Sequence, residues 1–133
     1  MNNIVVDASI LIAVVTNEPE KAKLVQLTQN ADLIAPPSIH WEIGNAFSAM
    51  FKRNRVALSE AVRAIEAYQK IPVRFVDVEI EESLKLASKL NIYAYDAYLI
   101  RCATKYKAPL LTLDQSLINS AKSIKAPVLE VTS

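Results

Sequence analysis

Short apolar runs alternate with amphipathic segments along this chain, and the alternation restricts the folds that it can adopt. The first run, residues 4–6, is Ile-Val-Val, which is β-branched and lacks polar alternation. Such a run suits a strand buried on both faces, as in a parallel sheet. Further runs lie at residues 32–37, 73–78, 109–113 and 127–131, with helical patterns between them. The pattern predicts an α/β fold, a three-layer α/β/α sandwich around a mainly parallel five-stranded sheet.

Capping residues indicate where several of the helices begin or end. Ser38 is a predicted N-cap for a long helix that runs to Arg53, and Ser59 is a predicted cap for the next helix. Asn91 suits the left-handed position that follows a helix over residues 80–90. No linker, repeat or low-complexity segment interrupts the sequence, so residues 1–133 are expected to form a single domain.

Charge and cysteine content narrow the possible classes of protein. The formal net charge is +1, which gives no bulk electrostatic reason to bind nucleic acid or an anionic membrane. The single cysteine, Cys102, cannot form an internal disulfide, and a buried thiol in a reducing cytosol is the simplest interpretation. The apolar run at residues 10–15 is far shorter than the ~20 residues that span a bilayer. We therefore expect a cytoplasmic protein that does not associate with membranes.

Acidic residues stand at the ends of two predicted strands. Asp7 directly follows the first strand, and Asp114 follows the strand at residues 109–113. The carboxyl ends of parallel strands meet at one edge of a sheet, where such folds bind ligands. Asp96 lies in the first turn of the preceding helix, at the head of an apolar stripe with Ile100 and Ala103. A carboxylate on that face is costly to bury unless a partner compensates its charge.

Glu42 adds a fourth acid, in the first two turns of the long helix. Structural roles remain open for each acid: Asp7 and Asp114 could be N-caps. Asp96 could interact with the helix dipole, and Glu42 could face solvent. Four adjacent carboxylates would repel one another unless a cation lay among them. Oxygen ligands favour Mg²⁺ or Mn²⁺ over zinc, and the one histidine, His40, is given no metal role.

Four segments carry a family resemblance: VVDASILIAVV, WEIGNAF, YDAYLIRCA and LLTLDQSL. Their acids, in this order, resemble the four-acid pattern of PIN domains, specifically the short VapC-type ribonucleases of toxin–antitoxin pairs. The match runs nearly from end to end, and it includes Ser9 two residues after the first acid and Thr112 two residues before the last. The resemblance implies that the metal-binding, catalytic acids are Asp7, Glu42, Asp96 and Asp114. It also implies that the supporting polar residues are Ser9, Asn45 and Thr112.

The resemblance implies a function as well. A PIN domain of this type would be a metal-dependent endoribonuclease, the toxin of a toxin–antitoxin pair, that hydrolyses RNA phosphodiester bonds at a four-carboxylate Mg²⁺ or Mn²⁺ site. Its expected partners are an RNA substrate, a cognate antitoxin protein and a second copy of itself in a homodimer. The segment Gln115–Leu117 departs from many relatives, which carry an aromatic residue after the last acid.

Two other classes remain open at this point. One is a non-catalytic PIN-like domain that binds RNA or a partner. The other is a receiver-type signalling domain that binds Mg²⁺, although a receiver normally has an acid pair after its first strand and this chain has Asp7 alone. A Rossmann nucleotide-binding module would need several glycines near the phosphate, and the chain has only Gly44.

Other notable side chains receive structural interpretations. Trp41 and Tyr95 stand next to acids, and we expect them to pack rather than to stack on bases. Two basic groups are expected to be ordinary solvated helix positions: Lys52, Arg53 and Arg55, and Arg101, Lys105 and Lys107. A partner surface could include Ala49, Ile65 and Tyr68, for which core packing is an equal explanation.

Overall fold

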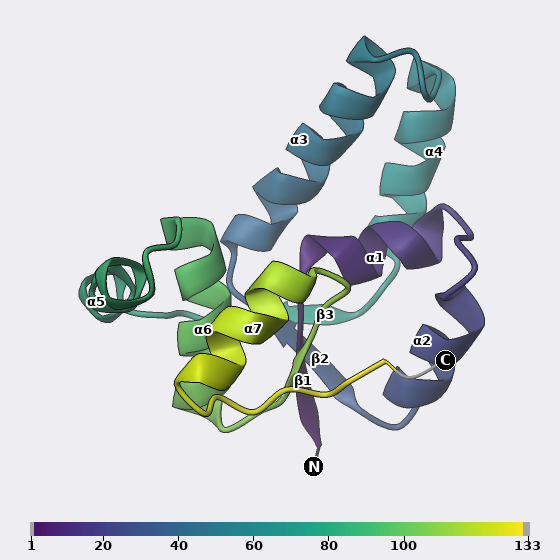
Figure 1. Ribbon diagram of the computed structural model, residues 1–133. Helices are drawn as coiled ribbons and strands as arrows, with labels where there is room; N and C mark the ends of the chain where they lie inside the picture. Colours follow the sequence, from purple (N-terminus) through teal and green to yellow (C-terminus); the bar gives the residue numbers. More distant parts are fainter. Residues whose placement is uncertain (1, 132–133) are drawn as a thin grey trace.

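Four short parallel strands form the centre of the computed structural model, which describes residues 2–131 (Figure 1). They are β1 (Asn3–Val6), β2 (Asp32–Ala35), β3 (Val73–Phe75) and β4 (Leu110–Leu111). Their order in the sheet is β3-β2-β1-β4, so the first strand is internal and every pairing is parallel. The predicted α/β fold around a parallel sheet is confirmed.

The fifth predicted strand, residues 127–131, contributes one parallel bridge, between Leu110 and Val128. The Leu110 amide donates to the Pro127 carbonyl and the Leu129 amide donates to the Leu110 carbonyl, each at 2.9 Å. β4 is only two residues long. This strand therefore offers few backbone groups to a neighbour, and the last segment extends the sheet by a bridge rather than by a full ladder.

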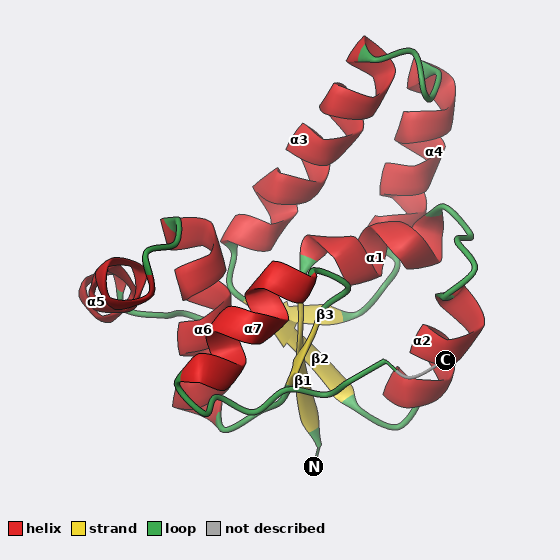
Figure 2. Cartoon of the chain, viewed as in Figure 1, coloured by secondary structure: helices red, strands yellow, loops and turns green. Residues whose placement is uncertain are grey.

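Helices cover both sides of the sheet. In the described chain they are α1 (Ala8–Val15), α2 (Lys21–Thr28), α3 (Ser38–Lys52), α4 (Leu58–Gln69), α5 (Ile80–Leu90), α6 (Ala94–Tyr106) and α7 (Gln115–Ser123). Figures 1 and 2 show the strands between α1 and α2 on one side and α6 and α7 on the other, as a three-layer sandwich requires. α3 and α4 form a hairpin that extends away from the sheet (Figure 1).

Two predicted helix caps are wrong by one or two residues. The N-cap of α3 is Pro37, and Ser38 is the first helical residue, without a capping bond from its side chain. The N-cap of α4 is Ala57, whose amide donates to Glu60 Oε1 at 3.0 Å. The carboxylate of Glu60, the third residue of the helix, therefore satisfies the backbone amide of the N-cap residue. The left-handed Asn91 after α5 is confirmed, with φ 53°.

The inner strands and α6 form the core. The internal strand β1 and its neighbour β4 are covered on both faces, because their apolar residues Val5, Val6, Leu110 and Leu111 are all fully buried. Each such side chain contributes roughly 1.5–3 kcal/mol on burial. Within residues 2–131, no helix combines the length and apolar character needed to cross a membrane.

The apolar stripe predicted on α6 faces this core. Ile100 and Ala103 are completely buried, so the helix face headed by Asp96 does point inward. Cys102 is buried on the same helix. Burial raises the pKa of its thiol to about 12, which leaves the thiol protonated and unreactive at neutral pH. The predicted structural role of Cys102 fits this environment.

Candidate active site

The four predicted acids lie at the carboxyl-terminal edge of the sheet or in helices that begin there. Asp7 follows β1 and Asp114 follows β4 by three residues. Glu42 lies in the second turn of α3, which follows β2, and Asp96 lies in the first turn of α6. The first turns of α3 and α6 lie side by side in Figure 1. We call these four residues the acid cluster.

The members of the acid cluster lie close enough to affect one another's ionisation. Burial is the largest cause of the raised pKa values of Asp7, Glu42 and Asp96, and neighbouring negative charges add to it. Asp7 and Asp96 act on Glu42, while Asp114 acts on the other two aspartates. None of the ion pairs formed by residues 2–131 includes these acids. The cluster is therefore negative and uncompensated.

Asp7 is the most enclosed of the four acids, with 6% of its surface exposed. Its Oδ1 accepts hydrogen bonds from the Ser9 hydroxyl at 2.6 Å and from the Ile10 amide at 3.2 Å. The bond from Ile10 makes Asp7 the N-cap of α1, so Asp7 does have the structural role of a helix cap. Burial still outweighs these bonds, and the pKa of Asp7 stays above its usual value.

Ser9 and Thr112 connect the Asp7 end of the cluster to the Asp114 end. The Thr112 hydroxyl donates to Asp7 Oδ2 and accepts a bond from the Asp114 amide at 3.0 Å. The Ser9 hydroxyl accepts from the Leu113 amide, also at 3.0 Å. These contacts join residues about one hundred positions apart in the sequence. They orient the Asp7 carboxylate, which is the kind of support that the resemblance implies.

Glu42 is the acid whose burial is least compensated by hydrogen bonds. Its Oε2 is buried and has no hydrogen-bond partner among residues 2–131. Burial, followed by the charges of Asp7 and Asp96, raises its pKa to about 7. A buried acceptor without a donor costs free energy, typically 1–3 kcal/mol by order of magnitude. The solvent-facing alternative for Glu42 is therefore not what the structure shows.

Asp96 and Asp114 complete the cluster in different ways. Asp96 is half-buried, and no hydrogen bond within the described chain engages its carboxylate. Asp114 is exposed and is the N-cap of α7, because its Oδ1 accepts from the amides of Ser116 at 2.9 Å and Leu117 at 3.2 Å. Within residues 2–131, both capping bonds go to this one oxygen. The charge of Asp114 contributes to the raised pKa values of Asp7 and Asp96.

Two polar residues of α3 lie outside this hydrogen-bonded network. Asn45 is exposed one turn beyond Glu42, and its side chain makes no hydrogen bond to the cluster within residues 2–131. Its supporting role stays a prediction. His40 bonds to the Tyr68 hydroxyl at 3.2 Å rather than to an acid. Tyr68 is itself buried, so it belongs to the core and not to a partner surface.

The chemistry of the acid cluster suits a hard divalent cation, although it is not a closed cage. Its donors are all carboxylate oxygens, and one of them, Glu42 Oε2, is buried without a partner. Within residues 2–131, no three side chains of His, Cys, Asp or Glu converge closely enough to hold an ion among them. Mg²⁺ keeps several water ligands and usually takes one or two carboxylates together with substrate phosphates. An open arrangement of acids is compatible with that mode of binding.

The aromatic residues beside the acids differ from expectation. Trp41 is 73% exposed and Tyr95 is 55% exposed, so the packing role expected for both does not bury either ring, although Tyr95 meets Tyr98 edge to face at 6.1 Å. The acids next to them in sequence point inward, which turns these two rings toward solvent. The basic side chains Arg101 and Lys105 are not free, because both pair with Glu79, at 3.0 and 3.2 Å.

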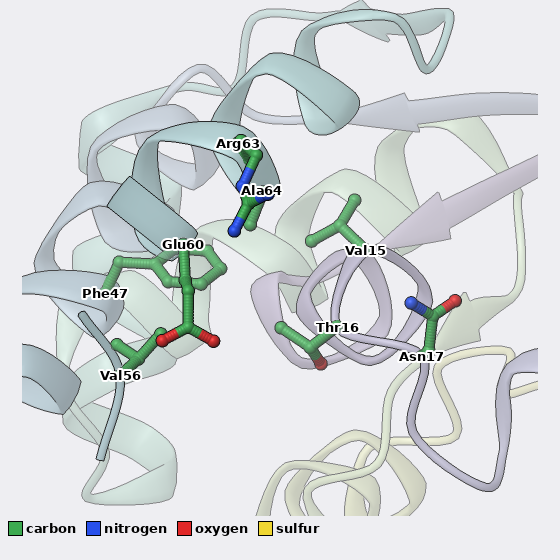
Figure 3. Close-up of a pocket in the computed structure, with 8 residues that line it drawn as sticks. All are labelled: Val15, Thr16, Asn17, Phe47, Val56, Glu60, Arg63 and Ala64. Atoms are coloured by element: carbon green, nitrogen blue, oxygen red, sulfur yellow. The ribbon is translucent and has the colours of Figure 1, made fainter. Parts of the chain in front are cut away.

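A separate cavity of about 350 Å³ lies between the end of α1 and the α3–α4 hairpin (Figure 3). Its apolar lining comes from Val15, Phe47, Val56 and Ala64, and Glu60 and Arg63 add charge. None of the acid cluster lines it. The cavity is thus distinct from the candidate active site.

Comparisons with known proteins identify relatives of this fold. Residues 4–122 match the family model described as PIN domain. The structure of PAE2754 from Pyrobaculum aerophilum is similar with a TM-score of 0.74 and 23% identity, over 96% of this chain and 90% of that one. A sequence comparison with curated proteins gives no significant match.

Two further structures carry functional names. VapBC2 from Rickettsia felis, bound to a DNA fragment from its promoter, has a TM-score of 0.69 and 14% identity, over 96% of this chain and 97% of that one. Mycobacterium tuberculosis VapC20, a sarcin–ricin loop cleaving toxin, has a TM-score of 0.62 and 14% identity, over 88% and 94%. At such identities the structures establish a shared fold.

Proposed function

The chain belongs to the PIN domain family, and from this premise we propose that it is a metal-dependent endoribonuclease of the VapC toxin type. The relative VapC20 is a toxin that cleaves the sarcin–ricin loop. We extend to this chain the reaction class, hydrolysis of RNA phosphodiester bonds, without extending that particular substrate. Residues 1–133 would form one such domain, since the family match already spans residues 4–122.

One observation carries the proposal: Glu42 lies near other acids, and no basic side chain among residues 2–131 pairs with it. Its pKa is raised to about 7 by burial and by Asp7 and Asp96, and its Oε2 has no donor among the same residues. An arrangement of this kind lowers stability in the absence of an ion. A divalent cation placed between these carboxylates would remove the repulsion and supply the missing partner.

The proposed catalytic roles follow from how each acid is held. Asp7, fixed by Ser9 and Thr112, is the rigid ligand, and Glu42, Asp96 and the free oxygen of Asp114 complete the set. Bound Mg²⁺ or Mn²⁺ would supply Lewis acidity, which makes a water molecule a better nucleophile toward phosphorus. The exposed position of Asp114 leaves room for a substrate phosphate at that side of the cluster.

The non-catalytic alternative is less consistent with the acid cluster. A domain that only bound RNA would gain nothing from buried, unpaired carboxylates, which repel phosphate groups when no cation is present. The receiver-type alternative is not supported by the family match. We therefore keep catalysis as the proposal.

A cleavage assay tests this function directly. Purified protein is incubated with a panel of single-stranded and structured RNAs in Mn²⁺, Mg²⁺ or EDTA. We expect cleavage only with a divalent ion, leaving 5′-phosphate ends, and Glu42→Gln should lower the rate by roughly 100-fold or more. Glu79→Gln is the matched control, because Glu79 lies in an ion pair outside the cluster. Cleavage in EDTA, or an unaltered rate for Glu42→Gln, would contradict the proposal.

Partners form a further part of the proposal. The similar VapBC2 structure motivates a cognate antitoxin protein for this chain as well. The cavity between α1 and the α3–α4 hairpin, with its apolar lining, is a suitable surface for it (Figure 3). We also propose a homodimer and a cytoplasmic location, where RNA substrates and an antitoxin would be present.

A further inference from the structure

An aromatic surface lies beside the acid cluster, and none of the proposed catalytic roles uses it. It consists of His40, Trp41, Tyr68 and Phe75, and we call it the aromatic shelf. The His40 ring contacts the other three, with centroids 4.8 Å from Trp41, 5.8 Å from Tyr68 and 6.1 Å from Phe75. The hydrogen bond between His40 Nδ1 and the Tyr68 hydroxyl holds the central ring in place.

Packing within the chain does not explain the outer rings of the shelf. Trp41 is 73% exposed and Phe75 is 44% exposed, whereas Tyr68 is buried beneath them. Trp41 meets His40 edge to face, at an interplanar angle of 82°. With 73% of its surface exposed, the indole remains largely open to solvent. Large exposed aromatic groups that cluster in this way usually mark a binding surface.

The position of Trp41 connects the shelf to the acid cluster. Successive residues of a helix are about 100° apart around its axis, so Trp41 lies between Glu42 on one side and His40 on the other. Glu42 points toward Asp7 and Asp96, and His40 points toward β3. Around the first turns of α3, Glu42 therefore faces the other acids, Trp41 is open to solvent, and His40 faces the rest of the shelf. A strand bound at the acids would pass over Trp41 next.

A hollow adjoins the shelf. The hollow, of about 160 Å³, is lined by His40, Tyr68, Gln69, Ile71, Val73 and Phe75. This is smaller than the roughly 300–1,000 Å³ of pockets for drug-sized ligands, and it suits one planar ring. Lys70, which follows Gln69 in the sequence, is exposed and enters none of the ion pairs formed by residues 2–131.

We propose that the aromatic shelf binds unpaired bases of the RNA substrate, with Trp41 stacking on the base nearest the acid cluster. This inference rests on the proposed function and adds a substrate-binding surface to it: Trp41 and the shelf would contact the bases beside the bond that is cut. Base-paired RNA buries the faces of its bases in the duplex and could not stack on the indole. The neighbouring hollow would receive the ring of the adjacent base.

Trp41 also reports on the proposal, because it is the only tryptophan of the chain. The full chain is titrated in EDTA, where no cleavage is expected, with a single-stranded RNA of about ten nucleotides, within the range that single-strand-binding folds occupy. Because the metal-free acids repel a nearby phosphate, the RNA concentration is raised until the signal saturates. We expect saturable quenching of the indole fluorescence. The same sequence annealed into a duplex should give little quenching. Binding without metal separates this test from the cleavage assay.

Variants measure the contribution of stacking to affinity. Trp41→Ala should weaken binding of a labelled single strand by about 5- to 150-fold, the range expected for the loss of one stacked base. Trp41→Phe should restore much of the affinity, while Trp41→Leu, apolar but not aromatic, should not. Leu58→Ala is the matched control, since Leu58 is 64% exposed and lies at the start of α4, near the far tip of the hairpin (Figure 1). Because Trp41 is exposed, its variants should melt as the wild type does.

The outcomes distinguish this inference from the proposed function. Saturable quenching by single strands in a protein that never cleaves RNA would support the shelf and reject the nuclease. If the wild type cleaves RNA but shows no quenching, and Trp41→Ala binds single-stranded RNA as tightly as the wild type, the shelf is rejected and the nuclease is not. If Trp41→Ala changes the oligomeric state in sedimentation while RNA affinity is unaltered, the shelf is a contact between copies of the chain, and the inference is wrong.

Discussion

Two glutamates in this molecule have opposite electrostatic environments. Glu42 has its pKa raised to about 7, by burial first and then by Asp7 and Asp96. Glu79 has its pKa lowered to about 2, chiefly by the hydrogen bond from Arg101 and also by Lys105. Arg101 Nε lies 3.0 Å from Glu79 Oε1, and Lys105 Nζ lies 3.2 Å from Glu79 Oε2. One carboxylate is surrounded by acids, and the other is held by two bases.

Helix α6 takes part in both environments. Its first turn carries Asp96 of the acid cluster, and its later turns carry the two bases that hold Glu79. The fold therefore places basic side chains beside one carboxylate, that of Glu79. Among residues 2–131, no basic side chain pairs with the acid cluster, in spite of a cost in stability. This contrast is the reason why we propose a cation site there.

The largest expected effect is stabilisation of the acid cluster by a metal ion. Mn²⁺ or Mg²⁺ that binds only the folded chain should raise the free energy of unfolding by about 2.7 kcal/mol at 100 times its dissociation constant. For a domain of this size, that is roughly 8 °C in the midpoint of a thermal melt. Potassium chloride of equal ionic strength should have no comparable effect.

Glu79→Gln should keep this metal response, since its ion pairs lie outside the acid cluster. Glu42→Gln should lose most of it. If millimolar Mn²⁺ does not change the midpoint of the wild-type thermal melt, the contrast between Glu42 and Glu79 does not reflect a metal site.

A second, smaller effect is the opposite pH dependence of the two glutamates in metal-free protein. The folded-state pKa of Glu42 is raised from 4.5 to about 7, so folding gains stability as the pH falls from 7 to 4.5. After a discount for partial exposure, that gain is roughly 1 kcal/mol. The folded-state pKa of Glu79 is lowered from 4.5 to about 2, so its stabilisation is present above pH 4.5 and is lost as the pH falls toward 2.

Urea melts in EDTA between pH 2 and 8 would separate the two contributions. Glu42→Gln should reduce the gain between pH 7 and 4.5, and Glu79→Gln should reduce the loss between pH 4.5 and 2. Identical pH profiles for wild type and Glu42→Gln would mean that Glu42 is not strained by its neighbours.

The smallest expected effect is that of Asp96→Asn on the metal-free protein. The substitution keeps the shape of the side chain, so the packing of Ile100 and Ala103 should survive. It removes one negative charge from the acid cluster, and stability should stay within about 0.5 kcal/mol or rise. Metal response and RNA cleavage should be lost together.

Denaturant melts without metal and a cleavage assay with Mn²⁺ measure both effects of Asp96→Asn. A purely structural Asp96 predicts the reverse, a loss of about 1 kcal/mol with cleavage intact. That result would remove Asp96 from the acid cluster as we describe it.

Much of the fold could be predicted from local sequence patterns. The unalternating apolar runs located the strands of the sheet, and the stripe through Ile100 and Ala103 oriented α6 correctly. The caps at Ser38 and Ser59 were misplaced because α3 begins directly after Pro37 without a side-chain cap, and α4 begins after Ala57, whose amide bonds to Glu60. The fifth strand was overestimated because pairing depends on the length of its neighbour β4, which the run itself does not reveal.

The sequence alone determined which residue types follow which strands, and hence that acids lie at one edge of a parallel sheet. This information is local, because backbone periodicity and burial patterns extend over only a few residues. Tertiary structure alone decided the charge environment of each acid. Glu79 meets Arg101 and Glu42 meets Asp7 only through the packing of elements distant in sequence, and electrostatic energy depends on those distances. The exposure of Trp41 was decided in the same way, because a ring packs only where another element covers it.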